Sequence, residues 1–289
     1  MPQNAGDGAR SPPSLRIPPS KSLSTPQRTI VIGASAGGVE ALREVVAKLP
    51  ADLNAALFVV LHIPPYVASS LPKILSRAGP LRAVHPEDGA SVRAGTIYVA
   101  PPDHHLLLEG QRIGVKKGPK ENRFRPSIDA LFRSAAHACG PRAIGVVLSG
   151  ALDDGTSGLW SIKRLGGIAI VQQPNEARFE SMPRSALEYV EVDHTLPSPE
   201  IGALLARLVA EPPPKEAAME TDERTRMDKE VAIAAEAEAY QKGIMELGAL
   251  TPFTCPSATA SSCGSPKGKC PGSAATPGTP TPTAPCSRR

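Results

Sequence analysis

The chain has 289 residues, 41% hydrophobic and 21% charged, which allows one sizeable hydrophobic core and a small second unit. Its formal net charge is only +4, its basic residues are scattered and 3% of its residues are aromatic, so nucleic-acid binding has little support. No apolar run approaches the length of a membrane span, and the N-terminus lacks the apolar segment of a secretory signal. We therefore expect a cytoplasmic protein without membrane insertion.

The ends of the chain differ in composition from its middle. Residues 1–27 are rich in Pro, Ser and Arg and predict a disordered segment. Residues 212–250 begin with three prolines and continue Ala- and Glu-rich with few large apolar residues, which suggests a linker and a helix that is either exposed or dependent on a partner. Residues 251–289 are Pro-, Thr- and Ser-rich and predict a disordered tail that holds four of the five cysteines, without the spacing of a disulfide framework or a zinc ribbon. The folded domain is expected to span residues 28–211.

Strand and helix patterns alternate within this domain. Short apolar runs that predict strands lie at residues 30–32, 55–63, 96–100, 143–148 and 168–171. Helical patterns lie at residues 39–49, 67–76, 125–138, 156–165, 182–190 and 198–210. Residues 105–117 predict two strands that turn at Glu109-Gly110. The alternation predicts an α/β fold with a doubly wound, mostly parallel sheet, helices on both faces and a small antiparallel hairpin.

The first predicted strand runs into a cluster of small residues, Gly33-Ala34-Ser35-Ala36-Gly37, and a helical pattern follows. This G-x-S-x-G spacing is typical of a strand-turn-helix elbow that exposes a nucleophilic serine. Two other interpretations remain open at this point. The stretch resembles a dinucleotide fingerprint, although Ser35 stands where that motif needs its second glycine, and Ser35 could also cap the following helix.

Polar side chains of three types follow three predicted strands. Ser35 follows the first strand, His62 ends the second, and Asp153 and Asp154 follow the strand at residues 143–148. Ligand sites in open α/β sheets form outside the carboxyl ends of the strands, so these side chains are expected at one edge. A serine hydroxyl needs a base to take its proton, and a carboxylate fixes the tautomer of a histidine base. Taken singly, His62 could be an ordinary strand-end residue and Asp154 a helix cap.

Metal and cofactor binding find little support in the sequence. The histidines of Asp103-His104-His105 are adjacent in a strand and would point to opposite faces of it. No H-x-x-x-H or H-E-x-x-H spacing accompanies them, and no P-loop is present. We expect no metal and no cofactor.

Six blocks in this order resemble the catalytic domain of the bacterial chemotaxis protein-glutamate methylesterases (CheB-type), over residues 28–210. They begin with the turn at Gly33 and His62-Ile63-Pro64 and continue with Ala100-Pro-Pro-Asp-His-His105, Arg125-Pro-Ser-Ile-Asp129, Leu148-Ser-Gly-Ala-Leu-Asp-Asp-Gly155 and Met182-Pro-Arg-Ser-Ala186. The resemblance implies a Ser-His-Asp triad in which Ser35 is the nucleophile, His62 the base and Asp154 the orienting carboxylate. Asp153 stands at a position that the family varies.

The resemblance also implies the reaction and its partners. The family removes methyl esters from glutamates on chemoreceptor helices, giving carboxylate and methanol, and many members deamidate glutamines. The expected partners are a methylated chemoreceptor or related helical signalling protein, and a methyltransferase or histidine kinase of the same pathway. No cofactor is implied.

The sequence departs from the family in three places. Ala36 stands where threonine commonly follows the nucleophile, and Ala151-Leu152 replaces part of a Gly-Met-Gly-type loop. The residues before Arg28 are too few and too polar for the N-terminal receiver domain of the usual enzyme, so a free-standing esterase domain is expected. These departures motivate an alternative of another class, an adaptor module in a signalling pathway that keeps the fold without useful turnover.

Overall fold

The structure, a computed structural model, describes residues 26–213, 221–235, 249–254 and 261–264. A seven-stranded sheet forms its centre, and every neighbouring pair of strands in it is parallel. In sheet order the strands are β3 (Arg82–Val84), β4 (Thr96–Val99), β2 (Ala55–Leu61), β1 (Arg28–Ala34), β7 (Ala143–Val147), β8 (Ile168–Gln172) and β9 (His194–Leu196). The predicted doubly wound α/β fold is confirmed.

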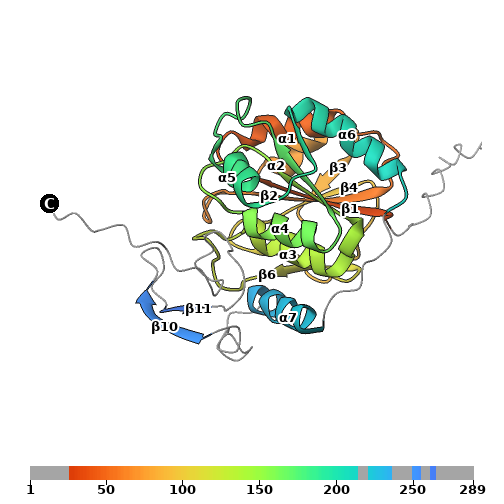
Figure 1. Cartoon of the computed structure of the whole chain (residues 1–289). Helices are drawn as coiled ribbons and strands as arrows, with labels where there is room; N and C mark the ends of the chain where they lie inside the picture. Colours follow the sequence, from red (N-terminus) through yellow and green to blue (C-terminus); the bar gives the residue numbers. More distant parts are fainter. Residues whose placement is uncertain (1–25, 214–220, 236–248, 255–260, 265–289) are drawn as a thin grey trace, which may run out of the picture.

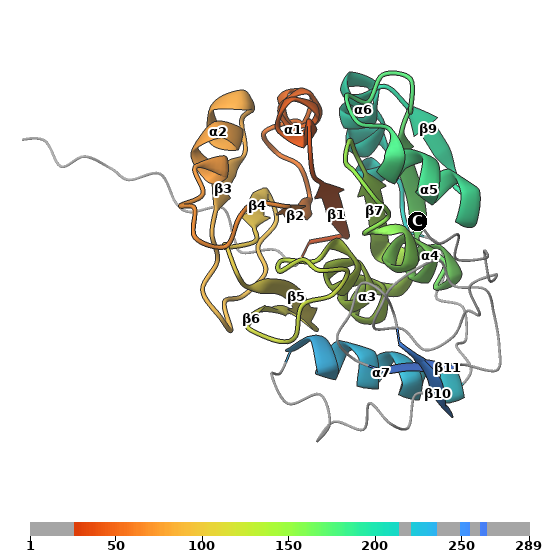
Figure 2. The same ribbon diagram turned by 90° about the vertical axis from the view of Figure 1, so that its left-hand side faces the viewer.

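Helices cover both faces of this sheet (Figures 1 and 2). One face carries α1 (Gly38–Ala47), α2 (Leu71–Ala78) and α6 (Ser198–Ala210), and the other carries α3 (Ile128–Cys139), α4 (Thr156–Arg164) and α5 (Ser181–Tyr189). A short 3-10 turn, Gly140–Arg142, joins α3 to β7.

The two faces of the sheet belong to two separate hydrophobic clusters. Along β1, Ile30 and Ile32 belong to the cluster under α1, α2 and α6, whereas Val31 belongs to the cluster under α3, α4 and α5. All seven residues of β1 and all seven of β2 are buried. A strand with both faces covered favours apolar residues at successive positions, which explains the continuous apolar runs in the sequence.

The predicted hairpin is a separate two-stranded antiparallel sheet of β5 (His105–Glu109) and β6 (Arg112–Lys116), with Glu109 opposite Arg112. Gly110 occupies the turn with a φ of 65°, in the left-handed region where a glycine has no steric cost. Leu106 and Leu108 of the hairpin enter the same cluster as α3. The hairpin therefore lies beside α3, on the same side of the main sheet (Figure 2).

Two short strands and two helix starts differ from what the sequence patterns predict. β3 and β9 have three residues each, too few for a strand period to be recognised. The helix expected from residue 67 begins at Leu71. The helix expected from residue 125 begins at Ile128, because its N-cap Ser127 is extended at φ −105° and ψ 142°.

The structure describes regular elements beyond the expected domain as well. The helix expected within residues 212–250 corresponds to α7 (Thr221–Ala235), and Ile233 and Ala234 in its last turn are buried rather than exposed. Where a disordered tail was expected, β10 (Ala249–Thr254) and β11 (Ser261–Gly264) pair as an antiparallel sheet. Residues 1–25 and 265–289, also expected to be disordered, lie outside the described residues.

No helix in the described ranges combines the length and the apolar character that crossing a bilayer requires.

Gly33 of β1 is needed for close packing. A Cβ atom at this position would lie 2.3 Å from Cγ2 of Ile128, at the start of α3. We therefore expect Gly33→Ala to lower the free energy of unfolding by about 1–3 kcal/mol, the usual cost of overpacking. Urea denaturation measures this change, and a variant as stable as the wild type would contradict the close approach of α3 to β1.

Candidate active site

Ser35 lies at the carboxyl end of β1, in the turn that leads into α1. Its backbone N–H donates to the carbonyl of Ser149, at 2.9 Å, which ties the turn to the loop after β7. Gly37 is the N-cap of α1, with a φ of 73°, and no side chain caps this helix. Capping, one of the alternatives left open by the sequence, is therefore not what the Ser35 hydroxyl does.

The three predicted strand ends meet where the order of the sheet reverses. From β1 the chain moves outward to β2 on one side and later returns to β7 on the other, so β1 lies between them. The N–H of His62, just after β2, donates to the carbonyl of Ala34 at 3.1 Å. Such a reversal point is where open α/β sheets form their ligand sites.

A hydrogen bond joins the side chains of His62 and Asp154 across the end of β1. His62 Nε2 lies 2.8 Å from Asp154 Oδ2, and the two side chains are 5% and 0% exposed. The imidazole stacks on the ring of Phe124, with centroids 3.7 Å apart and planes 9° from parallel. The His62 ring is thus held on one face by Phe124 and at Nε2 by Asp154. Among the described residues, Nδ1 of this ring has no hydrogen-bond partner, although it is buried.

Asp154 is surrounded by hydrogen-bond donors from the start of α3. The N–H of Ile128 donates to Oδ2 at 2.8 Å, and Ser127 Oγ and the N–H of Asp129 donate to Oδ1 at 3.0 and 3.3 Å. A fourth donor is Asn122 Nδ2, 2.9 Å from Oδ1. The free N–H groups and the dipole of a helix N-terminus favour an anion at this place. The carboxylate therefore accepts hydrogen bonds from the start of α3 and from His62. It does not cap α4, whose N-cap is Gly155 and which has no side-chain cap.

These contacts keep Asp154 ionised. Burial alone would raise the pKa of its carboxyl group, but the hydrogen bond and charge of His62, with the donors Ile128 and Asn122, outweigh burial and lower the pKa to about 2. An ionised carboxylate can accept a hydrogen bond from the N–H of the imidazole and so fix the tautomer of the ring.

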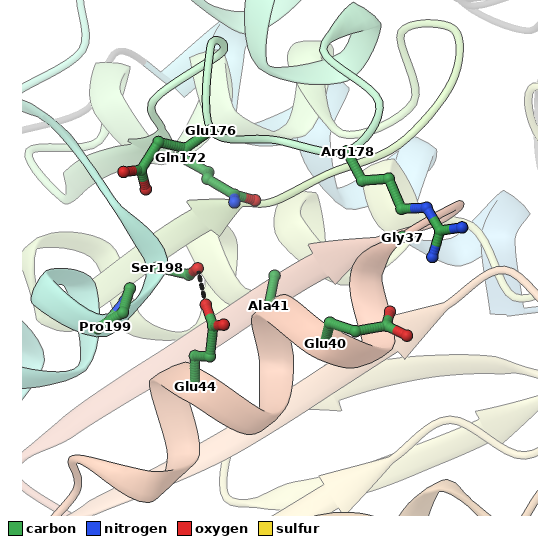
Figure 3. A pocket seen from close by; sticks show the side chains of 9 residues that line it. All are labelled: Gly37, Glu40, Ala41, Glu44, Gln172, Glu176, Arg178, Ser198 and Pro199. Carbon is green, nitrogen blue, oxygen red and sulfur yellow. Dashed lines mark hydrogen bonds between the residues drawn. The ribbon is translucent and has the colours of Figure 1, made fainter.

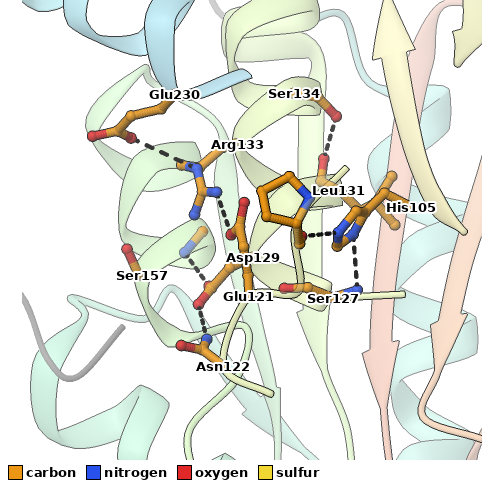
Figure 4. A network of polar contacts seen from close by, with 12 residues as sticks. His105, Glu121, Asn122, Ser127, Asp129, Leu131, Arg133, Ser134, Ser157 and Glu230 are labelled. Carbon is orange, nitrogen blue, oxygen red and sulfur yellow. Dashed lines mark hydrogen bonds and ion pairs between the residues drawn. The ribbon is translucent and has the colours of Figure 1, made fainter. Parts of the chain in front are cut away.

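A second buried carboxyl group, that of Asp129, shares the donor Asn122 with Asp154, and Figure 4 shows Asp129 with Asn122 beside it. Its Oδ1 accepts the N–H groups of Gly155 and Gly158, at 3.1 and 2.6 Å, and its Oδ2 accepts Asn122 Nδ2 at 2.7 Å. Burial and the nearby negative charge of Asp154 raise the pKa of Asp129 well above its ordinary value. The amide of Asn122 therefore bridges the two carboxylates.

The loop that carries Asn122 and Phe124 is anchored by a buried ion pair. Arg133 of α3, 5% exposed, binds Glu121 in this loop, and its Nε lies 3.6 Å from a carboxylate oxygen of Glu230 in α7 (Figure 4). At Gly118 the backbone of α7 comes so close that a Cβ atom would lie 2.1 Å from the carbonyl oxygen of Ala234. Helix α7 thus packs directly on the loop that supports His62 and Asp154.

These supporting residues are not evident from the sequence patterns. Asn122 and Phe124 lie before the Arg125–Asp129 block and match no motif by their spacing. Ser127 belongs to that block, and the Ser-Ile-Asp sequence at a helix start was the available signal for an anion held by helix N–H groups. Asp153, half-buried, makes no hydrogen bond to His62 within the described part of the chain.

A cavity of about 460 Å³ lies beside the turn, between α1 and the segments after β8 and β9 (Figure 3). It is lined by Gly37, Glu40, Ala41, Glu44, Gln172, Glu176, Arg178, Ser198 and Pro199. Ser198 donates to Glu44 across it, and Gln172 accepts the N–H of Ser149 at 2.8 Å. None of the lining residues belongs to the set Ser35, His62 and Asp154, so the cavity adjoins that set through Gly37 without containing it.

The described residues contain no group of three or more His, Cys, Asp or Glu side chains arranged to hold a metal ion. Of the two adjacent histidines, His105 is buried and bonds to the carbonyl of Pro119 at 2.8 Å, and His104 bonds to the carbonyl of Pro102 at 2.9 Å. Both are satisfied by backbone oxygens.

The fold and the site define a doubly wound α/β protein with a serine turn and a His–carboxylate pair at the reversal of its sheet. A family model described as CheB methylesterase matches residues 30–205, and the chain belongs to this family. Its structure is similar to the crystal structure of the CheB methylesterase catalytic domain of Thermotoga maritima. The TM-score is 0.61 and the identity 34%, over 63% of this chain and 98% of that one.

Curated relatives are named protein-glutamate methylesterases and protein-glutamine glutaminases. A putative protein-glutamate methylesterase/protein-glutamine glutaminase of Leptospira interrogans is 38% identical over 180 residues, which are 62% of this chain and 93% of the relative. A protein-glutamate methylesterase/protein-glutamine glutaminase of Anaeromyxobacter dehalogenans is 40% identical over 190 residues, and one of Methanosarcina acetivorans is 35% identical over 192 residues. The chain spans about half the length of these last two relatives.

The ionisation of Asp154 can be followed directly. Because its pKa in the folded protein is about 2, below the ordinary value of 3.8, we expect its carboxyl carbon resonance to keep the ionised shift down to about pH 3. The ionised form then contributes about 2 kcal/mol to stability above pH 4, and this contribution is lost as the pH falls toward 2. Carbon-13 NMR of aspartate-labelled protein measures the titration, and Asp154→Asn assigns the resonance. A midpoint near 3.8 would contradict the hydrogen-bonded site.

Proposed function

We propose that this protein is a serine hydrolase that removes methyl esters from glutamate side chains of chemoreceptor-like signalling proteins, with methanol as the second product. The observation that carries the proposal is the hydrogen bond from His62 to the buried, ionised Asp154, formed across the end of β1 where Ser35 lies. Membership of the CheB methylesterase family supports the same reaction.

In the proposed mechanism, Asp154 holds the His62 ring with its proton on Nε2, which leaves Nδ1 as the base. Nδ1 takes the proton of the Ser35 hydroxyl as the serine oxygen attacks the ester carbonyl. The imidazolium that forms is stabilised by the carboxylate and gives its proton to the leaving methoxide as the ester C–O bond breaks, so that methanol departs. Water activated by the same nitrogen then releases glutamate from the acyl-enzyme, so the cycle needs no cofactor.

Backbone N–H groups at the start of α1 would stabilise the oxyanion of the tetrahedral intermediate. In the described residues the N–H groups of Ala36 and Gly37 donate to no partner, whereas that of Gly38 is bonded to the carbonyl of Ser35 at 3.0 Å. Free N–H groups beside the reacting serine are the donors that such an intermediate requires. The positive end of the α1 dipole acts in the same direction.

The side chains of Ser35 and His62 are not hydrogen-bonded to each other in the described structure. Catalytic hydrogen bonds are often long without substrate and tighten in the Michaelis complex. We propose that ester binding brings the serine hydroxyl to Nδ1, the ring nitrogen that is buried without a partner.

The same groups can hydrolyse a glutamine amide, because deamidation proceeds through the same acyl-enzyme and releases ammonia instead of methanol. The names of the relatives include this glutaminase activity. We propose that the substrates are helical and cytoplasmic, and that a methyltransferase or histidine kinase of the same pathway is a further partner.

Methanol release tests the reaction and the nucleophile together. With a glutamate-methylated cytoplasmic fragment of a chemoreceptor as substrate, we expect the wild type to release methanol and Ser35→Ala to lower kcat by about ten-thousandfold or more. Ser91→Ala, which removes the hydroxyl of an exposed serine before β4, is the control and should behave as the wild type. Equal release by Ser35→Ala and wild type would remove Ser35 from the mechanism. A protein without turnover whose cellular role survives Ser35→Ala would be an adaptor.

Asn122 provides a test of how Asp154 is held. Its amide donates to Asp154 and Asp129, so Asn122→Ala should lower kcat by about ten- to a hundredfold, the effect of losing a hydrogen bond to a charged group, and leave KM nearly unchanged. Asn54→Ala, at an exposed asparagine bonded to Gln27, is the matched control. A wild-type kcat in Asn122→Ala would show that the remaining donors hold the carboxylate by themselves.

A further inference from the structure

Leu152 has a backbone conformation that leucine seldom adopts. Its φ is 68°, in the left-handed region, where the Cβ atom of an L-residue approaches the following carbonyl oxygen and costs free energy. A buried leucine could recover this cost through packing, but the Leu152 side chain is 49% exposed. The fold therefore gains little from a leucine in place of glycine here.

Leu152 lies midway between two parts of the proposed site. Gly150, two residues before it, lies so close to Ser35 that a Cβ atom at 150 would be 2.9 Å from the Cβ atom of the serine. Asp154, two residues after it, binds His62. Two residues of chain span at most about 7 Å, so Leu152 is held beside both ends of the proposed triad. Its exposed side chain is therefore carried by the short loop that joins these two parts of the proposed site.

The backbone of Phe179, a second exposed apolar residue, is hydrogen-bonded to the same loop. The N–H of Phe179 donates to Ser149 Oγ, and its carbonyl accepts the N–H of Gly150, both at 3.0 Å. Phe179 is 44% exposed. Two large apolar side chains from separate segments, the loop after β7 and the loop after β8, thus flank Gly150 and the serine turn.

We propose that Leu152, with Phe179 beside it, is a specificity-determining residue that receives an apolar side chain of the substrate helix next to the methylated glutamate. Strained backbone conformations cluster at active sites and ligand-binding segments, and here the strained residue carries an exposed apolar side chain in the loop between Gly150 and Asp154. The inference rests on the proposed function, because it takes the substrate to be a helical protein ester.

Helix geometry specifies which substrate residue is concerned. On a helix, the neighbours of a side chain on the same face lie three or four residues away. When the ester is bound at Ser35, an apolar residue one turn from the methylglutamate can cover Leu152. The substrate class is thus a helix with an apolar residue three or four positions from the modified glutamate.

The experiment separates the side chain from its backbone conformation. Leu152→Gly removes both the side chain and the backbone strain, Leu152→Ala removes the side chain alone, and Leu152→Met keeps an apolar side chain of similar size. Leu187→Ala, at an exposed leucine in α5, is the control for a general loss of surface hydrophobicity. Each variant is assayed for kcat, KM and Tm with the methylated chemoreceptor fragment.

We expect Leu152→Gly and Leu152→Ala to raise KM by about five- to tenfold, as expected when half of a leucine side chain loses its contact, with kcat within about twofold of the wild type. Only the glycine variant should raise Tm. Leu152→Met and Leu187→Ala should keep the wild-type KM. In the glycine variant, KM and Tm would then rise together. A leucine with only a structural role cannot give this result, because its removal would not weaken substrate binding while stabilising the fold.

Two results would overturn the proposal. One is an unchanged KM in both Leu152→Gly and Leu152→Ala, and the other is a joint fall of kcat and Tm in the glycine variant. Failure of the proposed function is distinguishable, because it is seen in the wild type as methanol release that Ser35→Ala leaves unaltered. If the wild type is active and dependent on Ser35, the Leu152 variants decide this inference alone.

Discussion

A carboxylate with no exposed surface must have its charge met by hydrogen-bond donors, and Asp154 meets this constraint with donors from three segments. They are the start of α3, Asn122 in the loop before α3, and His62 after β2. Each donor fixes a distance between parts of the chain that are far apart in sequence. Removing a donor while keeping the buried charge is costly, so the three segments are held together.

The rest of the architecture follows from holding α3 at this place. Ile128 packs on Gly33, so the helix start lies directly over β1 and its free N–H groups reach Asp154 after β7. The loop with Asn122 is in turn held by the buried pair of Glu121 and Arg133. Arg133 also has Glu230 of α7 beside it. Helix α7 lies outside the stretch matched by the family model, yet it contacts the structure that supports the proposed site.

The elements most easily predicted were those with the strongest burial. The runs at β1, β2 and β7 are apolar at nearly every position because both faces are covered, and the hairpin turn at Gly110 has its own local signal. The three-residue edge strands β3 and β9 have no such pattern, and they exist only because a neighbouring strand offers hydrogen bonds. The buried turn of α7 was missed for a related reason, since Ala-rich helices give a weak apolar stripe and pack only where the partner surface allows.

The sequence by itself determined the class of fold, the family, and the candidate set of Ser35, His62 and Asp154, because strand ends in a parallel sheet share one edge. Only the tertiary structure decided which other groups act on that set. Asn122, Phe124 and Ser127 reach it through the path of one loop and one helix start. The structure also decided the conformation of Leu152 and the exposure of its side chain. Residue spacing records local periodicity, whereas contacts between distant segments depend on how the whole chain packs.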